Sequence, residues 1–229
     1  MPGLMRRIVA RMREADRAPR RRRLFKNYAL QRAYDLVFLP IMVVLPSSWV
    51  SAIGMTTIRD YRIEAVKPHL HGLLIDVGAG WDNRLVEEYG NGVGFDIQYW
   101  EGYHGFRSRR LAVCRSDRMC FRDRQFDTAS VVAVLNHIPN REEVLTEIRR
   151  VLKDDGRVLL TMVAPWISWI NHNLRVLYDP DRDRKWDERE VWGLTDEQMG
   201  TLIAGTRFKL ERKVSYFFGL SMLYICSKA

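Results

Sequence analysis

The sequence LLIDVGAGWDNRLVEEYGNGVGFDI, residues 73–97, decides the fold. An apolar run leads to a tight glycine pair, Gly78 and Gly80, then a segment with helical character follows, and a second apolar run ends at Asp96. Apolar runs that alternate with helical segments are typical of βαβ units with parallel strands. The stretch also raises the question of which ligand the glycine turn holds.

The same alternation continues along the chain. The runs VVAVL and RVLLTMV are apolar throughout, as expected of strands buried on both faces. Gly219 separates two further strand-like runs and predicts an antiparallel pair at the sheet edge. We therefore predict an α/β fold with a Rossmann-like, doubly wound, mostly parallel sheet and a C-terminal antiparallel strand pair. The expected strands are 73–77, 92–97, 110–114, 127–134, 157–163, 208–218 and 220–228, and the expected helices are 56–67, 82–89, 140–152 and 195–205.

Length and composition indicate one sizeable domain with appendages. The chain has 229 residues, of which 47% are hydrophobic, and this is ample for a core. Its cysteines, Cys114, Cys120 and Cys226, form no CxxC motif or Cys/His cluster, which disfavours a disulfide framework and a zinc site. The acids of the run 179–190 lack ligand spacing, so we predict no metal site. A reducing, cytoplasmic location fits best.

The excess positive charge lies in an N-terminal arm. The net charge is +9, and residues 1–32 hold eleven Lys or Arg against two acids, so the remaining residues sum to zero. The uncharged, largely apolar run at 36–58 is interrupted by Pro40 and Pro46, whereas a spanning helix needs about 20 apolar residues in a row. We predict that residues 1–55 form a basic and apolar helical arm that lies on a membrane surface without crossing it.

Other interpretations of the arm stay open. It also fits a solvated basic tail followed by an ordinary packed helix, or an Arg-rich mitochondrial presequence, although residues 1–32 lack serine. An arm of this kind binds nucleic acid phosphates non-specifically, but the sequence has no RNA-binding signature. A protein partner is a further alternative. We assign residues 56–229 to the domain itself, with an insertion at 165–195.

A dinucleotide or a simple phosphate fits the glycine turn poorly. The dinucleotide fingerprint needs glycine or alanine where the chain has Asn83. A phosphate cradle is disfavoured because Asp76 and Asp82 bracket the turn with negative charge.

A ligand with both a carboxylate and a cation suits the turn better. Gly78 and Gly80 let the backbone approach closely, the helix N-terminus favours an anion, and Asp76 can meet an ammonium group. Asp96, which ends the second strand, is placed to accept hydrogen bonds from a ribose diol. An amino acid joined to a nucleoside has these groups, and S-adenosylmethionine is such a molecule.

Four segments resemble the class I S-adenosylmethionine-dependent methyltransferases, especially the small ones that act on small molecules. They are LLIDVGAG, GVGFDI, SDRMCFRDRQFDTASVVAVLNHIPN and EEVLTEIRRVLKDDGRVLLTMVAP, so the resemblance covers about residues 70–163. It implies S-adenosyl-L-methionine as the cofactor, with Asp117 facing the adenine amino group and Arg118 and Met119 capping the ring edge. Asn136, at the end of the fourth predicted strand, is expected at the cofactor rim.

Methyl transfer needs a general base only when the acceptor must lose a proton, as a hydroxyl does. His137 and His104 are the candidate catalytic residues, because histidine titrates near neutral pH. His172, in the insertion, is a weaker candidate. Each of the three also has a structural interpretation, in which it hydrogen-bonds the sheet end or anchors a loop.

The predicted function is S-adenosylmethionine-dependent O-methylation of a membrane-associated lipid, lipid-linked saccharide or isoprenoid quinone. Trp81 and Asp82 depart from the family's glycine loop, so a non-catalytic subunit that scaffolds a membrane complex is the alternative, and an RNA methyltransferase is the third. The aromatic residues of the insertion form either a lid over the acceptor or the core of a helical flap; they are Trp166, Trp169, Tyr178, Trp186 and Trp192.

Overall fold

The computed structural model describes residues 23–80, 83–96, 110–174 and 188–229, which divide into two compact units. The helical unit contains the described residues up to Tyr61 and helix α8 (Pro165–Leu174). The sheet unit contains the described residues of 62–164 and 188–229. The chain therefore leaves the sheet unit after residue 164 and returns to it at Glu188. The division into an arm at 1–55 and a domain at 56–229 stays a prediction.

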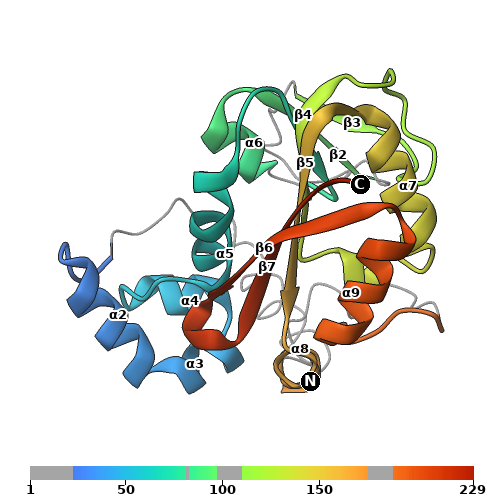
Figure 1. Cartoon of the computed structure of the whole chain (residues 1–229). Coiled ribbons are helices and arrows are strands. Elements are labelled where there is room, and N and C mark those ends of the chain that lie inside the picture. The colour runs from blue at the N-terminus through green and yellow to red at the C-terminus, as the bar shows by residue number, and fades with distance from the viewer. Residues whose placement is uncertain (1–22, 81–82, 97–109, 175–187) are drawn as a thin grey trace, which may run out of the picture. The chain divides into compact units, whose positions relative to one another are not determined.

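The sheet unit is built on a seven-stranded sheet in the order β3-β2-β1-β4-β5-β7-β6 (Figure 1). The first five strands pair in parallel, whereas β7 is antiparallel to both of its neighbours, β5 and β6. The predicted α/β fold with a C-terminal antiparallel pair is therefore confirmed. The strands are β1 (Leu74–Val77), β2 (Gly92–Asp96), β3 (Leu111–Val113), β4 (Phe126–Val132), β5 (Leu152–Val163), β6 (Phe208–Tyr216) and β7 (Ser221–Lys228).

The side chains of the last two strands explain their order in the sheet. β7 is largely buried and carries Leu223 and Cys226 in the core, so it lies between two strands. β6 exposes most of its residues, among them Lys209, Glu211 and Arg212, and forms the edge. Charged side chains on an edge strand oppose pairing with other chains.

The helices of the sheet unit follow local signals. α7 (Arg141–Val151) buries one apolar face, which includes Leu145 and Ile148. α9 (Asp196–Gly205) begins after the predicted N-cap Thr195, whose hydroxyl accepts from the backbone N–H of Gln198 in a capping box. α5 (Ile58–Val66) begins in the helical unit and ends in the sheet unit. The other helical elements of the sheet unit are α6 (Arg84–Tyr89), η1 (Lys67–His69), η2 (Leu135–His137) and η3 (Phe217–Gly219).

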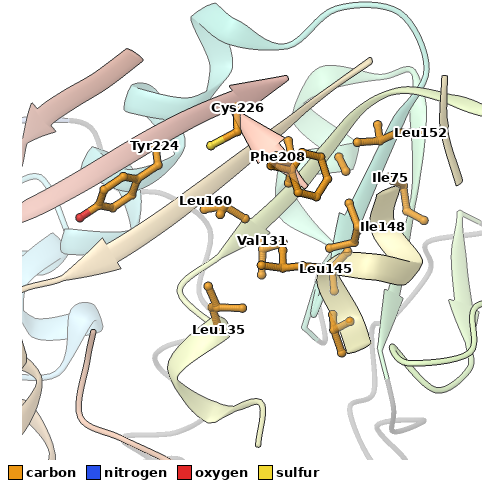
Figure 2. Packing of buried hydrophobic residues seen from close by; sticks show 14 of the residues in the cluster. Ile75, Val131, Leu135, Leu145, Ile148, Leu152, Leu160, Phe208, Tyr224 and Cys226 are labelled. Atoms are coloured by element: carbon orange, nitrogen blue, oxygen red, sulfur yellow. The ribbon is translucent and has the colours of Figure 1, made fainter. Parts of the chain in front are cut away.

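One hydrophobic core joins the sheet to α7 and α9 (Figure 2). Ile75 of β1, Val131 of β4 and Leu160 of β5 are fully buried in it beside Leu145 of α7. Burying one such side chain contributes about 1.5–3 kcal/mol to folding. This core fixes the strand ends that carry the candidate site.

Short helices make up the helical unit. α2 (Tyr28–Val37) begins at the N-cap Asn27, and α3 (Leu39–Val44) and α4 (Ser47–Ala52) follow. Pro40 lies in the first turn of α3 and Pro46 precedes α4, so the apolar run is broken where prolines were expected to interrupt it. Within the described ranges, the structure has no helix long and apolar enough to span a bilayer.

Candidate functional site

The turn after β1 crosses closely over the end of β2. Gly78 and Gly80 have φ angles of +71° and +70°, a region that glycine adopts without strain. The N–H groups of Gly78 and Ala79 both donate to the carbonyl of Phe95, at 2.9 and 3.1 Å. A Cβ atom on Gly78 would lie 2.7 Å from Cγ2 of Val134, whereas one on Gly80 would meet no described atom within 4 Å. The turn therefore needs glycine at position 78 for space as well as for conformation.

Asp76 and Asp96 lie on neighbouring strands. Asp76 of β1 is buried and accepts a 2.6 Å hydrogen bond from the hydroxyl of Ser130 on β4. Asp96 ends β2, and its Oδ2 accepts from the N–H of Gly80 at 3.1 Å, so this acid is bonded directly to the glycine turn. Because β1 and β2 are parallel neighbours, their carboxyl ends form one edge, where such sheets bind ligands. The predicted ammonium and ribose contacts stay predictions.

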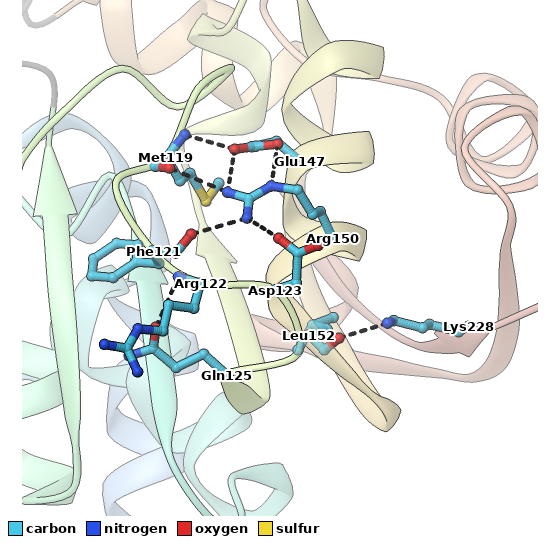
Figure 3. Close-up of polar contacts among 9 residues, drawn as sticks. All are labelled: Met119, Phe121, Arg122, Asp123, Gln125, Glu147, Arg150, Leu152 and Lys228. Carbon is cyan, nitrogen blue, oxygen red and sulfur yellow. Dashed lines mark hydrogen bonds and ion pairs between the residues drawn. The ribbon is translucent and has the colours of Figure 1, made fainter.

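The loop after β3 is fastened to α7 by a charged pair. Glu147 accepts from the backbone N–H of Met119 at 2.8 Å and pairs with Arg150 (Figure 3). Arg150 also donates to the carbonyls of Met119 and Phe121, at 3.2 and 2.9 Å. The hydrogen bond from Arg150 is the main cause that holds the pKa of Glu147 below its ordinary value. A helix therefore positions the loop that carries the predicted adenine contacts.

Asp117 is held inside the same loop. Arg115 binds both of its carboxylate oxygens, at 2.9 and 2.6 Å, and Asn140 donates to Oδ2 at 3.0 Å. The hydrogen bond from Arg115 lowers the pKa of Asp117, so this carboxylate is an ionised acceptor at neutral pH. Arg118 is exposed and Met119 is buried. The N–H of Met119 is bonded by Glu147 and its side chain lies in the hydrophobic core, so its contact with an adenine edge stays a prediction.

A histidine and a glutamate meet just beyond the carboxyl end of β4. His137 ends η2, and its Nδ1 lies 3.3 Å from Oε2 of Glu190; their side chains are 16% and 3% accessible. On the other side of the ring, the amide nitrogen of Asn136 lies 3.0 Å from Nε2. With the amide in this orientation, the hydrogen-bond network assigns the ring proton to Nδ1 and the lone pair to Nε2. The arrangement is that of a base oriented by a carboxylate.

Backbone bonds hold Glu190 beside η2. The N–H of Val191 donates to the carbonyl of Asn136 at 3.1 Å, and the guanidinium of Arg141 bridges the carbonyls of Asn136 and Arg189, at 3.1 and 3.0 Å. Sequence analysis missed Glu190, because the run 179–190 has the mixed charge of a solvated surface. No spacing rule links it to a histidine 53 residues earlier.

Several predicted residues fall outside the part of the chain that the structure describes. His104 is one of them, so its role as a base stays a prediction, and nothing is described of the side chain of His172. Trp166 and Trp169 of the predicted lid are exposed on α8. The remaining residues outside the described ranges are Trp81, Asp82, Tyr178 and Trp186.

The central region of the chain matches known methyltransferase sequences. Residues 76–160 match a family of methyltransferase domains. A ubiquinone/menaquinone biosynthesis C-methyltransferase of Bordetella avium is 34% identical over 71 residues, or 28% of each chain. An uncharacterised protein of Methanocaldococcus jannaschii is 28% identical over 106 residues, which are 44% of this chain and 50% of the relative. The chain thus spans half or less of these relatives' length.

Solved structures with low sequence identity share the fold. The 1,6-didemethyltoxoflavin-N1-methyltransferase of Burkholderia thailandensis, solved with 1,6-didemethyltoxoflavin and S-adenosylhomocysteine, is 17% identical over 73% of this chain and 76% of its own, with a TM-score of 0.54. A SAM-dependent methyltransferase from Aquifex aeolicus is 15% identical over 72% of this chain and 89% of its own, with a TM-score of 0.53. Residues 76–160 therefore belong to a methyltransferase domain, and the chain shares the fold of the solved S-adenosylmethionine-dependent methyltransferases. The predicted methyltransferase family is confirmed for this region.

The site residues fit the predicted cofactor, S-adenosylmethionine, whose demethylated product S-adenosylhomocysteine is bound in the Burkholderia thailandensis structure. The space beside Gly78 is filled by Val134, whereas a Cβ atom on Gly80 would meet no described atom within 4 Å, so Gly80 offers the backbone that an amino-acid moiety could approach. Asp76 and Asp96 present acids from two neighbouring strands, as an ammonium group and a sugar diol require. The expected acceptor groups thus lie at one edge of the sheet.

Proposed function

We propose that this protein is an S-adenosylmethionine-dependent methyltransferase that methylates a hydroxyl oxygen of a membrane-associated small molecule. The acceptor classes are a lipid, a lipid-linked saccharide and an isoprenoid quinone precursor. The observation that supports O-methylation is the pair formed by His137 and Glu190. His137 lies just beyond the end of β4, and β4 is the neighbour of β1, the strand that precedes the glycine turn.

This pair provides what a hydroxyl acceptor needs. Bound S-adenosylmethionine supplies an electrophilic methyl group on a positively charged sulfur. On transfer of this methyl group the C–S bond would break with its electron pair left on sulfur, and the acceptor oxygen would lose its proton as the C–O bond forms. His137 takes the proton at Nε2, and Glu190 stabilises the resulting imidazolium through the Nδ1–H group.

The side-chain amide of Asn136 occupies the basic nitrogen of His137 with a hydrogen bond. Since Nε2 accepts a hydrogen bond from Asn136, the acceptor hydroxyl must replace that bond before the proton moves. The bond that is given up contributes only about 0.5–1.5 kcal/mol, and the incoming hydroxyl restores an equivalent one. The released amide is then able to bind the acceptor or the cofactor rim, the place expected for Asn136.

The chemistry of the N-terminal arm supports a membrane-associated acceptor. Residues 1–32 carry the whole net charge of +9, and each basic residue near an anionic leaflet adds about 1 kcal/mol of attraction. A methyltransferase held at the bilayer meets a lipophilic acceptor in two dimensions, so the acceptor need not leave the membrane. The relative from Bordetella avium is named for the biosynthesis of ubiquinone and menaquinone, which supports the quinone class.

That relative also favours a second candidate, methylation of a ring carbon, because it is named a C-methyltransferase. The same base would serve both reactions. Removal of a phenol proton by His137 raises the nucleophilicity of the oxygen and of the neighbouring ring carbons. The position of the transferred methyl group in the product distinguishes the two.

The test is methyl transfer from labelled S-adenosylmethionine by the full-length protein, offered lipid, water-soluble and RNA fractions separately. We expect label in the lipid fraction, and mass spectrometry of that product identifies the methylated atom. A scaffold subunit would bind no cofactor and label no fraction, and an RNA methyltransferase would label only the RNA. Either outcome overturns the proposal.

A further inference from the structure

Helix α2 buries polar residues and exposes apolar ones, the reverse of the pattern in most helices at a water-exposed surface. It buries Gln31 and Asp35, which are 1% and 0% exposed, and it exposes Leu30, Leu36 and Val37. Helices of globular domains normally bury the apolar face and expose the polar one. Apolar surface left in water is unfavourable by about 25 cal/mol per Å². The outward face of α2 therefore favours an apolar partner.

A hydrogen-bond network fixes this orientation. Asp35 accepts from Nε2 of Gln31 at 2.9 Å, from the N–H of Thr56 at 3.1 Å and from the hydroxyl of Tyr61 at 2.8 Å. Gln31 also donates to the carbonyl of Gly54 at 3.0 Å. Burial, and then the bond to Asp35, raise the pKa of Tyr61, so its hydroxyl stays a donor. The polar face cannot turn outward without breaking these bonds.

Helix α8, far away in sequence, also exposes large apolar side chains, although it buries Ile167 as well as Ser168. Trp166 and Trp169, 55% and 52% exposed, are three residues apart and share a side of the helix, whereas Ser168 is 3% exposed. α8 contacts α3 within the helical unit. Tryptophan is enriched where proteins meet the interface of a bilayer, since its ring is apolar and its N–H is polar.

The charges of these segments complement an anionic surface. In residues 23–57 and 165–174 the single acid is Asp35, and it is buried in the network. The first of these segments also carries Arg23, Lys26 and Arg32. These segments therefore present no exposed carboxylate to an anionic headgroup, and the rest of the basic arm precedes them. The helical unit also contains Asp60, which is half-buried and accepts hydrogen bonds from the N–H and the hydroxyl of Thr57.

We infer that the helical unit docks on a bilayer with anionic headgroups, and that exposed side chains of α2 and the two tryptophans of α8 enter the boundary between headgroups and acyl chains. Trp166 and Trp169 are then membrane contacts, in place of the acceptor lid considered from the sequence. This inference deepens the proposed function. The biological purpose of docking rests on that function, because a membrane-bound acceptor requires the enzyme to be at the bilayer. Docking itself is measurable without any activity.

The test is cosedimentation of the full-length protein with phosphatidylglycerol/phosphatidylcholine vesicles and with pure phosphatidylcholine vesicles. Two double variants change the surface, Leu36→Ser with Val37→Ser and Trp166→Ser with Trp169→Ser. Leu210→Ser, at an exposed leucine on the edge strand β6, is the matched control. We expect each double variant to lower the partition coefficient on anionic vesicles by about tenfold or more, with no change for the control.

Three further measurements make the result decisive. Circular dichroism melting shows that both double variants remain folded. Vesicle binding by the double variants at the wild-type level overturns the inference. A wild-type dimer in light scattering that becomes monomeric in the double variants also overturns it, because the exposed face would then join two copies of the chain. Methyl transfer to a detergent-dispersed acceptor separates the proposals: its retention in the double variants supports a docking role, and its absence from every preparation overturns the proposed function but leaves the vesicle result standing.

Discussion

Oε2 of Glu190 lies 3.3 Å from Nδ1 of His137, although 53 residues of sequence separate the two. Glu190 touches the base and acts through it, so it is a positioning residue. Glu190→Gln should lower kcat for hydroxyl acceptors by about 10- to 100-fold and change KM little, because it removes the charge that stabilises the imidazolium. Glu190→Asp should restore part of the loss.

Acceptors of different acidity provide the decisive readout for this pair. A phenol that is already ionised at the assay pH needs no base, so Glu190→Gln and His137→Gln should slow its methylation far less than that of a neutral hydroxyl. Steady-state kinetics on a series of phenols measures this. Equal reductions in methylation rate for ionised and neutral acceptors would show that His137 and Glu190 have a structural role and no role as a base.

Gly78 should tolerate alanine much less well than Gly80 does. Both have positive φ, which costs alanine about 1 kcal/mol, but only at position 78 would the new Cβ meet a side chain, Val134. We expect Gly78→Ala to lower the melting temperature and the affinity for S-adenosylmethionine together. Gly80→Ala, the matched control, should have the smaller effect on both. Thermal melting and titration calorimetry give the two values.

Asp96 is expected to bind the cofactor through its charge. Asp96→Asn keeps an oxygen that can accept from the N–H of Gly80 but removes the anion, so the turn should stay intact. A hydrogen bond to a charged group contributes about 1.5–3 kcal/mol, so affinity should fall by about tenfold or more in calorimetry. Asp154→Asn, at a carboxylate 70% accessible on its side chain, is the control. Unchanged affinity in Asp96→Asn would remove the ribose assignment.

Glu147 should make the domain sensitive to acid. Its folded-state pKa lies below the ordinary value of 4.5, chiefly because Arg150 bonds the anion. A depressed pKa contributes stability that is fully present above pH 4.5 and is lost as the pH falls through the folded-state value. Glu147→Gln should therefore be less stable than the wild type at pH 7 and lose less on acidification. Melting temperatures between about pH 7 and pH 3 test this, with exposed Glu143→Gln as the control.

Much of the fold could be predicted because its signals are local. Largely apolar runs mark β1 and the second half of β5, and glycines mark the turn after β1 and the break before β7. Several boundaries differed by one or two residues, and the largest difference is in β5, which begins at Leu152 and not at residue 157. Leu152 pairs with Phe126 of β4 before a register shift, and regular pairing resumes at Arg157. The acids of the site were also predictable, since strand ends at one edge of a parallel sheet bring them together.

The rest depends on tertiary contacts that no local pattern encodes. Glu190 belongs to a run of alternating charges, and only its packing beside η2 distinguishes it. Helix α8 was not predicted as such, because large apolar side chains on several sides hide its period, although Pro165 at its first position is a typical start signal. The orientation of α2 was equally hidden, since its apolar face would ordinarily be assigned to the core.

The inverted helix α2 reverses the usual recipe for improving a protein's behaviour in solution. Replacing the aliphatic Val37 with glutamate should reduce aggregation of the purified chain at little expense in folding, because that side chain is 73% exposed. A hydrophobicity scale would rank the replacement of Asp35 with valine as benign in a helix so rich in apolar residues. The replacement should instead remove the acceptor that the hydroxyl of Tyr61 and the N–H of Thr56 use, and so unfold this part of the molecule.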